Sequence, residues 1–285
     1  MAEPLLFDTH QHLIYREAAR YSWTVRAPIL DGRDFTLDDY AALTKGLGVG
    51  GALFMEVDPD EERYQDETRF VAKAIDGSPT RGIIACCRPE HASGFDAWLE
   101  ESAELGVVGY RRILHMVDDG VSQTETFRRN VRAIGQAGRT FDVVMHARQL
   151  HLALELMTVC PDTQFVLDHC GNPDIANNAM DPWADAMTQL AKLPNVVVKF
   201  SGLTVNCGPG QDPATAVVPY LHRMIDIFGP DRILWGGDWP VVDLAVGLPR
   251  WIAITRQVLA TLSADEAAAI AHKTAERIYK VSMAA

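Results

Sequence analysis

Eight short apolar segments recur along this chain, and amphipathic segments separate them. The apolar segments are rich in Val, Ile and Leu and cover residues 5–10, 51–57, 82–87, 107–114, 141–147, 164–170, 196–202 and 233–239. Between them, segments such as 66–75, 94–105, 125–137 and 217–228 carry apolar residues three and four positions apart, as helices with one buried face do. Strands that alternate with helices predict a parallel sheet. Eight such units in 285 residues predict an α/β fold, a (β/α)8 TIM barrel forming a single domain over residues 1–285.

A doubly wound open sheet is the competing architecture, but it usually has fewer strands. The long polar segments favour the barrel, because residues 13–36, 171–182 and 202–214 each follow a predicted strand. They would therefore lie at the carboxyl ends of the strands, where barrel enzymes place their active sites.

Histidine and aspartate stand at the ends of four predicted strands. His10 and His12 end the first, His146 the fifth, His169 the sixth and Asp238 the eighth. Residues two apart on a strand point to the same side, so both His10 and His12 can face the barrel mouth. Imidazole and carboxylate groups suit zinc, and after it manganese or iron. The remaining histidines are expected to be surface or helix residues: His91, His115, His151, His222 and His272.

Four further side chains are candidates for binding a substrate. Arg112 could hold a carboxylate through two hydrogen bonds, although alternation allows either Arg111 or Arg112 to face the barrel interior, but not both. Lys199 lies in an apolar strand, where a lysine without a partner is costly. Trp239 and Trp23 could stack on a sugar ring or belong to the core.

Charge and composition indicate which kinds of molecule this protein is expected to bind. The formal net charge of −12 argues against a nucleic acid or an anionic membrane, since phosphate binding needs a dense basic patch. We expect no signal peptide and no membrane span, because no stretch approaches 18 uncharged apolar residues. The five cysteines form no CxxC pair, which indicates free thiols in a reducing compartment. We therefore expect a cytoplasmic enzyme with a small-molecule partner, and a homo-oligomer is left open.

Several motifs together resemble those of a known family. "FDTHQH" followed by "YSW", "QFVLDHCGNPDI", "VVVKFSGL" and "PDRILWGGDWPV" are similar in order and wording to the amidohydrolase-related TIM-barrel hydrolases, in particular their sugar-lactonase-like branch. The resemblance runs from residue 5 to about residue 280. It implies hydrolysis of a cyclic ester, such as a fucono-, rhamnono- or galactono-lactone.

The resemblance also implies roles for single residues. His10, His12, His146 and Asp238 match positions that hold one metal ion in the wider superfamily. His169 matches a histidine that contacts the attacking water or the substrate carbonyl, and Asp238 matches the general base. Dinuclear members have a bridging Lys or Glu on the fourth strand, where this chain has Arg111 and Arg112. We therefore expect at most one divalent metal ion, with zinc as the preferred ion. Hydrolysis without a metal remains an alternative.

Two other functions remain to be weighed. A metal-dependent decarboxylase of a muconate- or benzoate-type acid shares the same histidines and aspartate, although "DTHQH" and "GDWP" favour a lactonase. A barrel that only binds a ligand has little need for a carboxylate such as Asp238. A serine hydrolase is disfavoured, because the chain has no G-x-S-x-G elbow.

Overall fold

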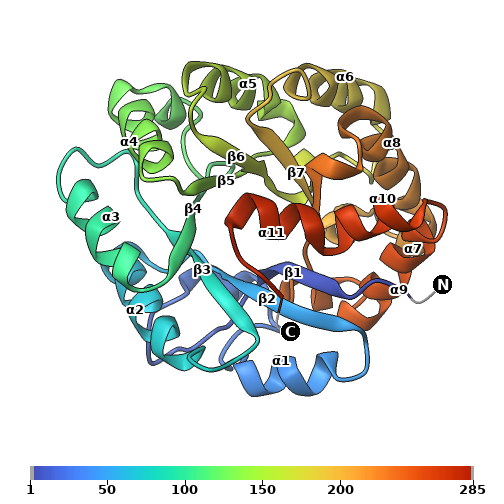
Figure 1. The fold of residues 1–285 in the computed structure, drawn as a ribbon, viewed down its shortest axis with the longest axis horizontal. Coiled ribbons are helices and arrows are strands. Elements are labelled where there is room, and N and C mark those ends of the chain that lie inside the picture. Colours follow the sequence, from blue (N-terminus) through green and yellow to red (C-terminus); the bar gives the residue numbers. More distant parts are fainter. Residues whose placement is uncertain (1–2, 284–285) are drawn as a thin grey trace.

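The eight predicted strands form one parallel sheet that curls into a barrel (Figure 1). The protein is described by a computed structural model, which covers residues 3–283. Each strand pairs in parallel with the next along the chain, and the sheet has the order β1 to β8. The strands are β1 (Leu6–Gln11), β2 (Val49–Met55), β3 (Thr80–Cys86), β4 (Val107–Ile113), β5 (Thr140–Val144), β6 (Gln164–Leu167), β7 (Val196–Phe200) and β8 (Ile233–Trp235).

Helices surround this barrel, so the prediction of a single-domain (β/α)8 fold is confirmed (Figure 1). They are α1 (Leu37–Thr44), α2 (Tyr64–Ala74), α3 (Phe95–Glu104), α4 (Glu125–Gln136), α5 (Leu150–Val159), α6 (Met180–Leu190), α7 (Pro213–Ala216), α8 (Val218–Phe228), α9 (Leu248–Leu259), α10 (Ala264–Ala268) and α11 (Thr274–Tyr279). Residues 269–273 between α10 and α11 form a π-helical turn. Within residues 3–283, no helix combines the length and the apolar character needed to cross a membrane.

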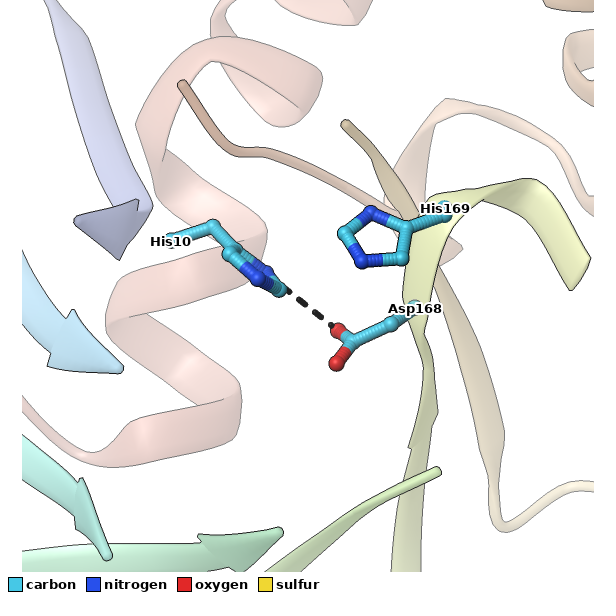
Figure 2. Close-up of side chains that lie close together, drawn as sticks. All are labelled: His10, Asp168 and His169. Carbon is cyan, nitrogen blue, oxygen red and sulfur yellow. Dashed lines mark ion pairs between the residues drawn. The ribbon is translucent and has the colours of Figure 1, made fainter. Parts of the chain in front are cut away.

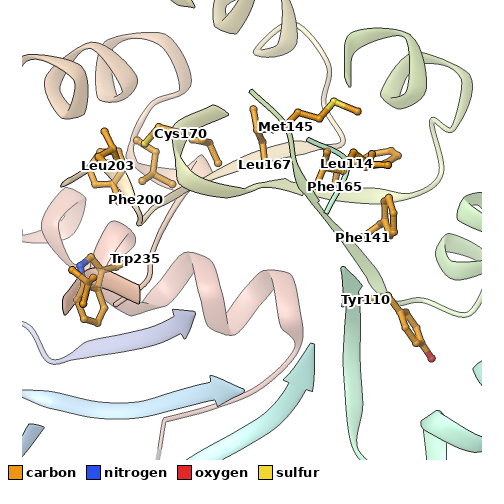
Figure 3. Close-up of a cluster of buried hydrophobic side chains, with 14 of the residues drawn as sticks. Tyr110, Leu114, Phe141, Met145, Phe165, Leu167, Cys170, Phe200, Leu203 and Trp235 are labelled. Carbon is orange, nitrogen blue, oxygen red and sulfur yellow. The ribbon is translucent and has the colours of Figure 1, made fainter. Parts of the chain in front are cut away.

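Side chains fill both sides of the sheet. On the outside, residues such as Phe141, Phe165 and Trp235 pack between the strands and the helices (Figure 3). On the inside, a second cluster joins Phe7, Leu53, Met55, Ile84, Val166, Val197 and Leu234 to three residues at the end of the chain, Ala275, Ile278 and Tyr279. Helix α11 therefore closes one end of the barrel, and the opposite end is left for a cavity.

The first and last strands meet through Asp8 rather than through a long ladder. Asp8 Oδ1 accepts hydrogen bonds from the backbone N–H of Gly237 (2.7 Å) and of His10 (2.9 Å), and Oδ2 accepts one from the Tyr40 hydroxyl (2.6 Å). A Cβ atom at Gly237 would lie 2.4 Å from Asp8 Oδ2, so only glycine allows this approach. We call these contacts the β1–β8 seam, and they fix the end of β1 against the segment that follows β8.

Candidate active site

A cavity of about 290 Å³ opens at the carboxyl ends of the strands. Polar and apolar side chains from most of the strand ends share its wall. The residues that line it are His12, Trp23, Val57, Asp58, Arg111, Ile113, His115, Met116, Val144, His146, His169, Asn172, Gly202, Val205, Asn206, Asp238 and Val241. Side chains that are far apart in the sequence therefore face one small volume, as the strand-end pattern predicts.

His10 and His12 both point toward Asp238. The Oδ1 atom of Asp238 lies 3.5 Å from His10 Nε2 and 3.4 Å from His12 Nε2. His12 Nδ1 lies 3.0 Å from the Met55 carbonyl oxygen, which can only accept, so Nδ1 carries the hydrogen and Nε2 keeps its lone pair. Gln11 points the other way and its Oε1 accepts a hydrogen bond from Thr80. Strand alternation thus places the two histidines as expected.

Asp238 lies three residues beyond the end of β8 and is held there by the seam. Its backbone N–H donates to the carbonyl of His10 (2.9 Å), and its φ of 57° is in the left-handed region. Such a conformation in a buried non-glycine residue costs of order 1–3 kcal/mol and is typical of functional positions. Burial acts to raise the pKa of Asp238, but the imidazoles of His169, His12 and His10 outweigh it and lower the pKa to about 2. Asp238 is therefore a carboxylate at neutral pH.

His169 lies beside this group, in a tight turn formed by residues 168–171. Its Nδ1 lies 2.9 Å from Ser201 Oγ, and a Cβ atom at Gly202 would come within 2.3 Å of the same nitrogen. Gly202, with a φ of 64°, is thus required for the ring to fit. Burial lowers the pKa of His169, so the ring is neutral at pH 7.

Asp168 is a site residue that the sequence reading missed. It is fully buried, and its Oδ1 lies 3.6 Å from His10 Nδ1 (Figure 2). Asp238 approaches the other nitrogen of the same ring, Nε2. Lys199 Nζ lies 2.9 Å from Asp168 Oδ1 and 2.7 Å from Asp142 Oδ2. Burial would raise the pKa of Asp168, but the Lys199 ammonium and His10 hold it well below its usual range. Lys199 was the signal in the sequence that could have revealed Asp168, because a lysine in an apolar strand requires a buried carboxylate partner.

Lys199 lies inside the barrel and does not reach the cavity wall. Its side chain is 0% exposed and does not line the cavity. This placement does not support the prediction that it binds substrate, since its two carboxylate partners, Asp142 and Asp168, are also fully buried and do not line the cavity. Its ammonium group instead keeps the Asp168 carboxylate ionised beside His10.

The structure places Arg111, and not Arg112, toward the cavity. Arg111 Nε lies 2.5 Å from Glu56 Oε1, its Nη2 donates to the Glu56 carbonyl (2.6 Å), and its Nη1 lies 3.1 Å from His10 Nε2. Arg112 points to the other face of β4 and pairs with Glu90 through Nη2 (2.5 Å). The geometry therefore does not support Arg112 as a substrate-binding residue, because strand alternation turns its side chain away from the cavity.

The two tryptophans fall into different environments. Trp23 lines the cavity, and its Nε1 donates to the Val57 carbonyl (2.8 Å). Trp239 is only 3% exposed and packs against Phe35 and Tyr40 at ring distances of 5.5 and 5.6 Å. Trp239 therefore supports the seam from behind, and only Trp23 is positioned to touch a ligand.

His146 lies apart from the cluster around Asp238. Strand β5 ends at Val144, and the His146 backbone N–H caps the following turn by donating to Gln149 Oε1 (3.0 Å). Its ring packs on His115, 4.6 Å away, in the cavity wall. His146, expected as the fourth metal ligand, therefore lies in another part of the cavity wall. His115, expected to be a surface or helix residue, also lines the cavity.

The donor set of the cluster fits one divalent cation. Among the described residues, the atoms that His10, His12 and Asp238 can offer lie within 4.8 Å of one another. Ligand atoms on a tetrahedral zinc ion are separated by about 3.4 Å, which matches the distances of 3.4 and 3.5 Å from Asp238 to the two histidines. A cation bound to His10 would replace the hydrogen bond from Arg111 Nη1.

Known proteins resemble this chain over most of its length. An L-fucono-1,5-lactonase from Burkholderia ambifaria is 28% identical over 84% of this chain and 81% of its own. A 4-sulfomuconolactone hydrolase from Rhizobium radiobacter is 26% identical over 82% of this chain and 75% of its own. A crystal structure of an amidohydrolase from Burkholderia multivorans with bound zinc has a TM-score of 0.88 and 27% identity, and the match covers 98% of this chain and all of that one (100%). The amidohydrolase family model matches residues 7–281. This chain therefore belongs to the amidohydrolase family.

Proposed function

We propose that this protein hydrolyses a lactone by attack of water on the ester carbonyl. The observation that carries the proposal is a buried, ionised carboxylate, Asp238, placed among imidazoles at the wall of a small cavity. This is the arrangement needed to accept a proton from water without a nucleophilic serine or cysteine. The similarity to two lactone hydrolases at 26–28% identity supports the same reaction.

In this reaction Asp238 acts first as a base and then as an acid. Its carboxylate takes a proton from the attacking water as the carbon–oxygen bond forms, and the carbonyl becomes a tetrahedral oxyanion. The ring C–O bond then breaks, and Asp238 gives the proton to the departing oxygen. His169 is the candidate for holding the oxyanion, because Ser201 engages its Nδ1 and leaves Nε2 for the cavity.

His10, His12 and Asp238 are the residues that would hold a divalent cation, with zinc the preferred ion for these ligands. A cation held there would polarise the attacking water or the carbonyl. The buried ion pairs behind the site, Lys199 with Asp168 and Arg111 with Glu56, keep the imidazoles oriented in either case.

A lactone panel read by a pH indicator tests the proposal, because ring opening releases one proton. We expect turnover of at least one sugar-acid lactone, with fucono-, rhamnono- and galactono-lactones as the first compounds. The metal content of the same sample is measured, and the assay is repeated after treatment with a chelator. Absence of turnover across sugar-acid and aromatic-derived lactones would contradict the proposal.

A metal-dependent decarboxylase of a muconate- or benzoate-type acid is the alternative, since it would use the same histidines and aspartate. Release of carbon dioxide from such acids, with no proton release from lactones, would favour it. Among the described residues, Arg111 is the one Lys or Arg side chain that lines the cavity, and Glu56 engages it. The similarity to two lactone hydrolases at 26–28% identity favours the lactonase.

A further inference from the structure

We infer that the protein has a second binding site, on the outside of the barrel and separate from the active site. Helix α1 lies outside the barrel next to β2 (Figure 1), and a cavity of about 620 Å³ lies between this helix and the strands β1 to β3. The site takes a small neutral molecule with an apolar body and one oxygen that accepts a hydrogen bond, such as a cyclic ketone, ester or amide. This inference does not depend on the proposed lactone hydrolysis.

The cavity exists because α1 is short and buries little against the sheet. It has eight residues, of which Tyr40 is the one buried residue. By contrast, α3 and α9 each bury a tryptophan, Trp98 and Trp251. The strand opposite α1 contributes Gly51 and Ala52 to the cavity wall. Small residues on both sides therefore leave a space that the protein's own side chains do not fill.

A hydrogen-bond donor without a partner lies at the floor of this cavity. Gln11 is 0% exposed, and its Oε1 accepts a hydrogen bond from Thr80 Oγ1 (3.0 Å). Among the described residues, no acceptor pairs with its amide nitrogen, Nε2. A buried N–H without an acceptor is unfavourable, and native proteins satisfy nearly all such groups. An oxygen atom of a molecule in the cavity would satisfy this one.

The rest of the wall determines what kind of molecule carries that oxygen. Apolar side chains from α1, from β2 and from the turn before β3 line the cavity: Leu37, Ala41, Val49, Ala52 and Pro79. The charged residues of the wall, Asp38 and Lys45, are exposed and have opposite signs. An ion would therefore leave water without gaining a buried partner of opposite charge. A neutral apolar body would instead remove apolar surface from water, which is favourable.

Water alone is the simplest alternative occupant of this cavity. One water molecule can accept the hydrogen bond from Gln11. A buried water needs two to four polar partners, however, and most of this wall is apolar. Water thus satisfies the amide nitrogen but leaves the apolar wall hydrated, whereas an apolar molecule with one oxygen satisfies both.

The site lies on the reverse side of the strand that carries His10 and His12. Gln11 stands between these two histidines, and its side chain points out of the barrel toward Thr80. Tyr40 also lines the cavity, and its hydroxyl donates to Asp8 in the β1–β8 seam (2.6 Å). No described residue lines both this cavity and the active-site cavity. A bound molecule would therefore contact Tyr40 behind the seam without occupying the active site.

A titration of ¹⁵N-labelled protein with cyclohexanone, followed by NMR, tests the inference. The signal of the Gln11 side-chain amide is assigned by its disappearance in Gln11→Leu. We expect a saturable shift of this signal and of the backbone amide signal of Ala52, with a dissociation constant of order 1 mM for a compound of this size. If neither signal shifts up to about 50 mM cyclohexanone, or if only signals of the active-site cavity shift, such as that of Val144, the inference is wrong.

A variant that fills the cavity tests where the probe binds. Ala41→Phe adds a ring to the cavity wall at an exposed position of α1, where the fold can accept it. We expect it to weaken cyclohexanone binding at least about tenfold, as read from the Ala52 signal. Ala42→Phe, at the next exposed residue of the same helix and outside the cavity wall, is the matched control and should change the affinity by at most about twofold. Equal binding to Ala41→Phe and to the unsubstituted protein would overturn the inference.

Removal of the donor tests the hydrogen bond. Gln11→Leu keeps an apolar side chain on the floor but has no N–H, and we expect binding about fivefold weaker. Thr80→Val breaks the bond between Thr80 and Gln11 but leaves the amide nitrogen, so the affinity should stay within about twofold. Unchanged affinity in Gln11→Leu would show that the amide does not bind the probe and would contradict the inference. If Gln11→Leu does not fold, the shift of the Gln11 signal in the unsubstituted protein decides.

Discussion

Burial sets the charge of the individual groups in this site. Asp238 and Asp168 are kept ionised by their basic neighbours, whereas burial lowers the pKa of His10, His115 and His169 and leaves these rings neutral at pH 7. Neutral imidazoles next to a carboxylate can accept or donate protons and can bind a cation. The protonation state of each of these residues is thus a consequence of its buried position near a strand end.

His115 should make stability depend on pH below neutrality. Its folded pKa of about 4 is below the unfolded value of 6.5, so between these values the unfolded chain binds the additional proton. The free energy of unfolding should therefore fall as the pH falls from about 6.5 to about 4. His115→Asn lacks this contribution. Urea unfolding at several pH values should show the unsubstituted protein losing stability relative to the variant, and a constant difference between the two would contradict this account.

The sequence predicted the fold more fully than the site. All eight strands follow from the apolar segments, and the positions of His10, His12, His169 and Asp238 follow from the strand ends. Asp168 was missed because its role depends on Lys199, which lies on the neighbouring strand β7. The direction of Arg111 depends on the register of β4, which the run of two arginines left ambiguous.

At the scale of elements, the β1–β8 seam decides the geometry around Asp238. β8 contains only three residues, Ile233–Trp235, and the segment after it is held by Asp8 and by hydrogen bonds to β1. The Asp238 N–H donates to His10, and the His12 N–H donates to the Trp239 carbonyl (2.8 Å). Backbone contacts thus align Asp238 with His10 and His12, which come from the two ends of the barrel sheet.

Gly237→Ala should disturb this alignment. The new Cβ would lie 2.4 Å from Asp8 Oδ2 and 2.9 Å from Leu248 Cδ1, so the seam must open to admit it. We expect a loss of about 1–3 kcal/mol in the free energy of unfolding, together with a lower kcat. Tyr40→Phe is the control, because it removes the hydrogen bond to Asp8 without a clash. It should cost about 1–2 kcal/mol and spare most of kcat. Equal effects of both variants on kcat would contradict the role given to the seam.

At the scale of the whole molecule, buried charges connect the two ends of the barrel. The Tyr279 hydroxyl, on α11, donates to Asp142 Oδ2 (2.8 Å), and Lys199 joins Asp142 to Asp168 beside His10. Tyr279 also packs in the inner cluster that closes the barrel. The last helix therefore supports the site from the opposite end, through residues that do not touch the cavity.

Lys199→Met should reveal how much the fold depends on this chain of charges. It leaves Asp142 and Asp168 buried without their shared cation, and we expect a loss of about 3–5 kcal/mol in the free energy of unfolding. Lys192→Met, at an exposed lysine on the turn after α6, is the matched control and should change stability by at most about 0.5 kcal/mol. Urea unfolding checks both. A similar stability for the two variants would show that the buried carboxylates do not need Lys199.

The central claim is that Asp238 transfers the proton during hydrolysis, and the Asp238→Asn variant measures it most directly. The amide keeps the size of the side chain but cannot accept the proton from water. We expect kcat for the best lactone of the panel to fall by at least about 100-fold, while the variant stays folded by circular dichroism. Asp231→Asn, at an exposed position outside the cavity, should keep the full rate. Full hydrolytic activity in Asp238→Asn would contradict the mechanism.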